Sequence, residues 1–212
     1  MKVKRFWSPR LAVVAVLLLL GVALFVSSAS AGGSHKETKF RWDIISTDFA
    51  KHTISPGGIA SAIANDGSSI TLTGEGTFNA ASNFGNRNVT GGGTWKTFDS
   101  SGNPTASGTY QVTGFVSFKV FRGVPPPTLK DLIGDPATAR SGLLFVTIRY
   151  SDGSTGVLTV SCAQPGPPAI VPPTVFEGIR VSKDLADYWN GEEPPAPPGN
   201  ANRTVFHIVG ED

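Results

Sequence analysis

Residues 143–162 read LLFVTIRYSDGSTGVLTVSC and contain the clearest structural signal in the chain. Apolar and polar side chains alternate on both sides of a central Asp-Gly pair, and such a pair readily adopts the positive φ angles of a tight hairpin turn. The segment therefore predicts two antiparallel strands joined at residues 151–154. Leu158, Val160 and Cys162 fall on one face of the second strand, so we expect Cys162 to be a small buried side chain.

The same alternation recurs in short segments from residue 39 onward, separated by Gly, Pro, Asn, Asp and Ser. Residues 69–78 and 108–120 are the other long examples, and the total is eight to nine strands. Closing the sheet removes exposed strand edges. We therefore expect an all-β fold, a single antiparallel barrel or a strongly coiled meander.

One short helix is expected near the C-terminus, over residues 183–189. Ser182 is a suitable N-cap, an Asn-Gly pair follows the segment, and Leu185, Tyr188 and Trp189 lie three and four residues apart on one face. Pro-rich segments are expected to connect the strands. They lie at residues 123–142, 165–173 and 192–200.

The composition excludes several classes of protein. Of the 212 residues 40% are hydrophobic and 16% charged, with 25 Gly, 16 Pro and a single Cys. These values exclude a collagen, a coiled coil and a disulfide-stapled mini-protein. A single Cys permits no internal disulfide, so the stability must come from a hydrophobic core.

The N-terminus has the pattern of a secretory signal peptide over residues 1–31. Its first ten residues include four basic side chains and no acid, the next 16 are apolar, and the segment ends in Ala-Ser-Ala. We expect cleavage after Ala31, secretion, a linker at residues 32–38 and a single barrel domain at residues 39–212. An uncleaved membrane anchor is the alternative, although 16 apolar residues are short for one.

Removal of the signal peptide changes the sign of the net charge. The whole chain carries +2, whereas the remainder has 14 basic and 16 acidic residues. The basic residues of the remainder stand singly, so we expect neither a nucleic-acid partner nor membrane contact after cleavage.

Three Gly-Thr-aromatic triplets recur at intervals of 17 and 15 residues and end at Phe78, Trp95 and Tyr110. Together with Phe118, these residues are the candidate wall of a ligand cavity. The alternative is a packing role, in which each glycine lets the sheet bend and a neighbouring ring covers the gap. A small barrel is wide enough either to be filled by side chains or to hold one small ligand, so both hypotheses stay open.

No catalytic, cofactor or metal motif is found in the sequence, and we assign no residue to such a site. His35, His52 and His207 are dispersed along the chain. Asp99 and Asp152 belong to turns that lack the ligand spacing of a calcium loop.

Few acidic residues lie inside predicted strands. They are Asp43, Glu75 and Glu177. A pair of converging carboxylates is what glycoside hydrolysis needs, but the alternation favours a solvent-facing position for each of these residues.

Three segments carry a resemblance to uncharacterised exported bacterial proteins. They are GGGTWKTFDSSGNPTASGTYQVTGF at residues 91–115, the hairpin at residues 143–162, and FEGIRVSKDLADYWN at residues 176–190. In architecture the chain also resembles the small antiparallel barrels of the allene oxide cyclase, dirigent and lipocalin kinds. This resemblance implies an apolar cavity as the site and carries over no catalytic residue.

We therefore expect a secreted, non-catalytic β-barrel protein that binds a small apolar or aromatic ligand, without a cofactor. One alternative is a cyclase, isomerase or hydrolase that uses the cavity for shape and an acid or His for proton transfer. Another is a structural cell-envelope protein. The sequence leaves the ligand and the oligomeric state open.

Overall fold

The computed structural model describes residues 38–80, 88–121, 129–163, 175–192 and 201–211. The expected signal peptide and most of the Pro-rich connectors lie outside these residues. Residues 36–212 form one compact unit. Within its described part the chain is all-β, as expected, with one 3-10 turn, η1 (Pro136–Thr138).

The described residues form fourteen strands, several of them very short. They are β1 (Thr38–Asp48), β2 (Thr53–Pro56), β3 (Ala60–Ile63), β4 (Ser69–Leu72), β5 (Glu75–Asn79), β6 (Gly92–Phe98), β7 (Pro104–Phe121), β8 (Lys130–Asp131), β9 (Ala139–Tyr150), β10 (Thr155–Cys162), β11 (Gly178–Lys183), β12 (Ala186–Tyr188), β13 (Asn190–Gly191) and β14 (Arg203–Glu211).

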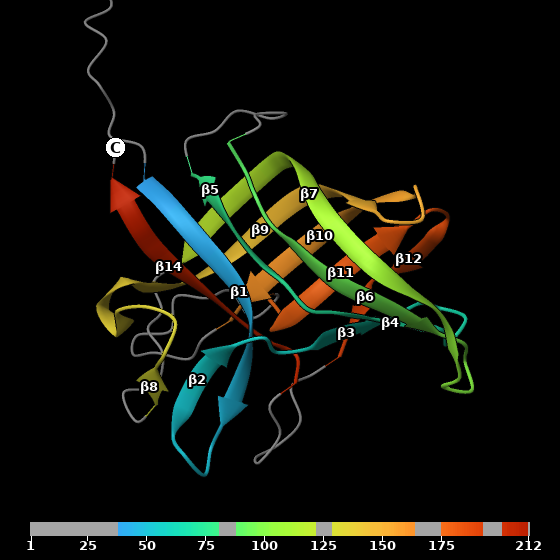
Figure 1. Ribbon diagram of the computed structural model, residues 1–212, viewed down its shortest axis with the longest axis horizontal. Helices are drawn as coiled ribbons and strands as arrows, with labels where there is room; N and C mark the ends of the chain where they lie inside the picture. Colours follow the sequence, from blue (N-terminus) through green and yellow to red (C-terminus); the bar gives the residue numbers. More distant parts are fainter. Residues whose placement is uncertain (1–37, 81–87, 122–128, 164–174, 193–200, 212) are drawn as a thin grey trace, which may run out of the picture. The chain divides into compact units, whose positions relative to one another are not determined.

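Six of these strands close into an antiparallel barrel. Hydrogen bonding runs from β1 to β5, β6, β7, β9 and β14, and β14 pairs again with β1. Figure 1 shows β1 and β14 side by side, with β7 arching over the sheet. The expected barrel is thereby confirmed as a closed antiparallel sheet, and the other eight strands extend it.

The extra strands extend the closed ring from three of its strands. β10, β11 and β12 continue the sheet outward from β9, and β4, β3 and β13 continue it from β6. β2 pairs with β1 and, in parallel, with β8. The predicted hairpin is confirmed as β9 and β10, whose turn has Gly153 at φ 92° and a 2.9 Å hydrogen bond from the Tyr150 amide to the Ser154 carbonyl.

Alternation along the strands separates the core from the surface. The main core comprises inward-facing side chains such as Trp42, Phe78 and Phe206, each with no exposed surface. Cys162 is fully buried, as predicted. A second, smaller core around Ile45 lies where β2 and the segment that includes β8 cover the outward face of β1 and β14.

The helix predicted over residues 183–189 is wrong. These residues instead complete a hairpin between β11 and β12, in which Val181 pairs with Tyr188. Asp184 takes the left-handed conformation, with φ 52°, that a tight turn requires, and Asp tolerates this conformation better than most residues. Leu185 is fully exposed at the turn, so it does not contribute to the apolar helical face that the spacing suggested.

Two further expectations differ in detail from the structure. The expected strand at residues 69–78 is divided into β4 and β5 at Thr73 and Gly74, which contributes to a higher strand number. The expected connector at residues 123–142 contains β8, η1 and the first residues of β9. Its proline triplet lies outside the described residues.

Candidate functional site

The four aromatic residues predicted to line a cavity fall into two separate groups. Phe78 is buried, Phe118 is half-buried, and their ring centroids lie 4.7 Å apart. Trp95 and Tyr110 are buried, and each contacts Tyr150, at 5.6 and 6.4 Å between centroids. The structure therefore brings Phe78 to Phe118 and brings the other two residues to a shared tyrosine.

These rings pack tightly against neighbouring side chains. Phe118 also contacts Phe40 at 4.9 Å and Phe206 at 5.1 Å. The polar ends of the second group are satisfied by the backbone, since the Trp95 indole donates to the Thr109 carbonyl at 3.1 Å and the Tyr110 hydroxyl to the Thr73 carbonyl at 2.9 Å. Burial raises the pKa of the Tyr110 hydroxyl far above its usual value. This environment agrees with the packing hypothesis for the Gly-Thr-aromatic triplets.

A cluster of charged residues lies on the opposite, outward face of the same sheet. Asp43 on β1 stands directly across from Glu75 on β5. Arg41, two residues before Asp43, donates to both Asp43 carboxylate oxygens at 2.7 and 2.8 Å and also to Glu75. The Asp43 side chain has no exposed surface, whereas that of Glu75 is 58% exposed. The buried partner therefore anchors the guanidinium, and the exposed carboxylate faces solvent.

The electrostatics of this cluster follow from its burial. Removal from water raises the pKa of Asp43, against the lowering effect of its hydrogen bonds with Arg41. The hydrogen bond with Asp43 in turn raises the pKa of Arg41. With both acids ionised, one guanidinium donates hydrogen bonds to two carboxylates, and the net charge of the three side chains is −1.

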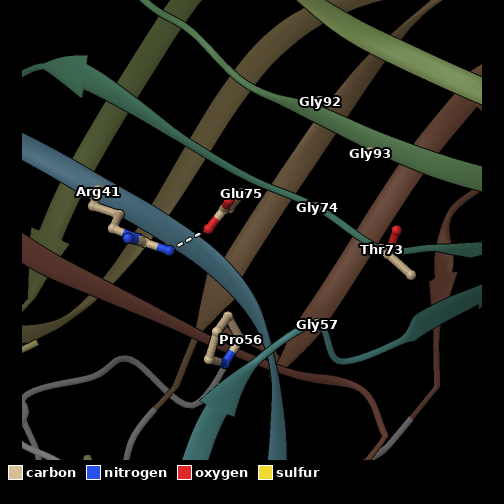
Figure 2. A pocket seen from close by; sticks show the side chains of 8 residues that line it. All are labelled: Arg41, Pro56, Gly57, Thr73, Gly74, Glu75, Gly92 and Gly93. Carbon is tan, nitrogen blue, oxygen red and sulfur yellow. Dashed lines mark hydrogen bonds and ion pairs between the residues drawn. The ribbon is translucent and has the colours of Figure 1, made fainter. Parts of the chain in front are cut away.

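Two hollows open on this face and share Arg41 and Glu75, the pair that Figure 2 shows at the larger one. Their volumes are about 550 and about 300 Å³. Glycine backbone forms much of their walls. The lining residues are Arg41, Pro56, Gly57, Thr73, Gly74, Glu75, Gly92 and Gly93 in the larger, and Arg41, Glu75, Gly76, Thr77, Thr90 and Gly91 in the smaller.

Close packing of the backbone explains why glycine occupies these walls. A Cβ atom on Gly93 would overlap the carbonyl oxygen of Thr73, and one on Gly76 would overlap that of Thr90. Side chains are thus excluded, and backbone groups and the Arg41–Glu75 ion pair supply much of the polar surface that a ligand would meet.

A second polar pair lies beside this cluster but is closed to solvent. His207 stands across from Arg41 in the β1–β14 pairing and contacts Asp131 on β8 at 2.9 Å. The two side chains are 1% and 0% exposed, and the His207 ring packs against Gly134. Hydrogen bonds from His207 and from nearby backbone amides lower the pKa of Asp131 despite its burial. The pair therefore joins the β8 segment to the barrel wall and presents no group to an external ligand.

The other residues considered for chemistry are dispersed. His52 lies exposed in a turn with φ 52°, and His35 lies outside the described residues. Asp99 and Asp152 accept hydrogen bonds from their own turns. Within the described ranges, no three His, Cys, Asp or Glu side chains converge to hold a metal ion. No helix of the described residues is long and apolar enough to cross a membrane.

The chain matches no protein-family model, no curated protein and no solved structure. The class is therefore defined by geometry alone: an all-β protein with a closed antiparallel barrel, a tightly packed aromatic core and glycine-walled hollows on its outer face. Sequence patterns identify Asp43 and Glu75 as acids within strands but miss Arg41 and the hollows; the spacing of Arg41 and Asp43, which places both on one strand face, is the signal that could have identified the charged pair.

Proposed function

We propose that the protein is an exported, non-catalytic binding protein that holds a small amine in the hollows beside Glu75. One observation carries the proposal. The Glu75 carboxylate is 58% exposed, lines both hollows and belongs to a cluster in which two carboxyl groups share one guanidinium.

The charge balance favours a cationic ligand. Arg41 divides its donors between Asp43 and Glu75, and Asp43 is fully buried, so Glu75 is the acceptor of this cluster that a ligand can reach. A protonated amine supplies the missing positive charge and up to three hydrogen-bond donors. Such charge-assisted hydrogen bonds are stronger than neutral ones.

The walls of the hollows lack the side chains that usually hold an apolar ligand. Pockets for apolar ligands are lined mainly by apolar and aromatic side chains, and the residues that line these hollows include no aromatic ring. An apolar ligand between Phe78 and Phe118 would need ring faces that are open to a cavity, whereas these rings contact each other.

An enzymatic function has weaker support from this site. Acid-base chemistry needs a positioned proton donor and acceptor that both reach the substrate. In the cluster Asp43 has no exposed surface, and the neighbouring His207 is buried against Gly134. A hydrolase, cyclase or isomerase would therefore have Glu75 alone as an accessible carboxylate here.

Calorimetric titration of the full-length chain tests the ligand. We expect 1,4-diaminobutane to bind and 1,4-butanediol, which matches it in length without the charge, to be inert. Raising the salt concentration should weaken binding. Glu75→Gln should weaken it about tenfold or more, since a charge-assisted hydrogen bond is worth roughly 1.5–3 kcal/mol.

Asp187→Asn is the matched control, because Asp187 is an exposed acid on β12 that lines neither hollow. It should bind the diamine as the wild type does. Equal binding of the diol, or binding that survives Glu75→Gln, would overturn the proposal.

The exported location is the second part of the proposal and is tested separately. Amino-terminal sequencing of protein recovered from the culture medium should find a chain that begins at Gly32. A chain that stays in the membrane fraction and still begins at Met1 would instead favour an anchored envelope protein.

A further inference from the structure

A second candidate site lies on a different part of the sheet, on the outward face of β9, β10 and β11. It is an apolar hollow of about 100 Å³ that shares no residue with the hollows at Glu75. Its walls include Leu143, Phe145, Phe176, Arg180 and Trp189. Trp189 is 48% exposed. A large aromatic side chain is therefore left in contact with solvent beside an apolar hollow.

Arg180 is the feature of this hollow that points to a ligand. Its guanidinium carbon lies 4.2 Å from the centroid of the Phe176 ring. Among the ion pairs of the described residues it has no carboxylate partner, and its Nε atom is buried without a hydrogen bond. A half-buried guanidinium in this state can bind an anionic group without displacing a carboxylate partner.

The surrounding structure holds these groups in place. The Ser161 hydroxyl donates to the Phe176 carbonyl at 2.5 Å, and the Phe176 ring lies against Gly191. Arg180 pairs with Thr159 across the β10–β11 ladder. The guanidinium is thus positioned between a fixed ring and the sheet before any ligand arrives.

Trp189 is positioned by the β11–β12 hairpin. The β11–β12 pairing ends with Val181 opposite Tyr188, and the next residues of the two segments, Arg180 and Trp189, both line the hollow. The hairpin that replaces the expected helix therefore brings the exposed indole and the unpaired cation together.

We propose that this hollow binds a small monocarboxylate with a short apolar tail. The carboxylate binds the Arg180 guanidinium, which matches a carboxylate in geometry and charge. The tail occupies the apolar hollow beside Phe145 and Trp189. The volume limits how much of the tail is enclosed. A cavity of about 150 Å³ holds a benzene molecule, so this hollow of about 100 Å³ encloses a few carbon atoms, and the rest of the tail lies against the exposed Trp189.

Titration of the full-length protein with hexanoate tests this site. Trp42 and Trp95 are buried, and Trp7 lies outside the described residues. We expect a saturable change in tryptophan fluorescence, and its loss in Trp189→Phe, which keeps the other three tryptophans, identifies Trp189 as the source. Hexanamide has the same tail without the charge and should bind about tenfold or more weakly. This comparison uses wild-type protein and does not depend on the folding of a variant.

Variants then identify the cation. Arg180→Gln should weaken hexanoate binding about tenfold or more, and Arg180→Lys should restore part of it, because Lys keeps the charge but not the planar fork. Arg149→Gln, which removes an exposed arginine from β9, should leave binding unchanged. Equal affinities for hexanoate and hexanamide, or no saturable binding of hexanoate, would overturn the proposal.

Discussion

Glu177 gives the chain a measurable dependence of stability on pH. Its carboxylate accepts hydrogen bonds from the Ala163 and Thr204 amides, each at 2.6 Å, and so joins the end of β10 to the start of β14. Burial raises the pKa of Glu177 from the usual 4.5 to about 7, against the lowering effect of these hydrogen bonds. Glu177→Gln keeps an acceptor at this position and removes the titration.

The sign and size of the effect follow from linkage. Because the folded-state pKa of Glu177 lies above its unfolded value, its contribution to stability is complete below about pH 4.5 and is lost as the pH rises through about 7. A pKa difference of about 2.5 units corresponds to about 3 kcal/mol. The wild type should therefore lose about 3 kcal/mol between pH 4.5 and 8 at this residue, while Glu177→Gln loses none of it.

Urea unfolding followed by tryptophan fluorescence measures this difference across the pH range. The free energy of unfolding of Glu177→Gln minus that of the wild type should rise by about 3 kcal/mol from pH 4.5 to 8. Asp187→Asn controls for the loss of an exposed carboxylate and should give a nearly flat difference. A flat or falling curve for Glu177→Gln would refute the reasoning, because it would mean that the two amide hydrogen bonds outweigh burial.

Three further substitutions test packing by urea unfolding. Gly93→Ala should lower the free energy of unfolding by roughly 1–3 kcal/mol, because the added methyl group overlaps a backbone carbonyl oxygen. The control Gly210→Ala meets no atom and should change stability by less than about 0.5 kcal/mol. Equal effects of the two substitutions would contradict the steric argument. Asp131→Ala should cost roughly 1–3 kcal/mol by leaving the buried His207 without this partner, and an unchanged midpoint would show that the pair adds nothing. Phe78→Ala should cost roughly 3–5 kcal/mol and leave diamine binding intact; a folded variant that no longer binds would place the ligand inside the barrel.

Features set by neighbouring residues were predictable from the sequence, and features set by distant contacts were not. The β9–β10 hairpin depends on alternation and on an Asp-Gly turn, both of which act within 20 residues. At residues 183–189 a helical spacing competed with a possible turn at Asp184. The turn forms because the pairing of Val181 with Tyr188 buries both side chains in a core shared with distant strands.

The candidate site at Glu75 likewise has one part that depends on neighbouring residues and one part that depends on distant contacts. The placement of Arg41 and Asp43 on one face follows from the period of a strand. Their meeting with Glu75, more than 30 residues later, depends on the register between β1 and β5, which places Phe40 opposite Phe78 and Asp43 opposite Glu75. A shift of this register by one residue would expose the fully buried Phe78 and point the Glu75 side chain toward the core. The apolar core therefore selects the register, and the charged cluster on the outer face is a consequence of that selection.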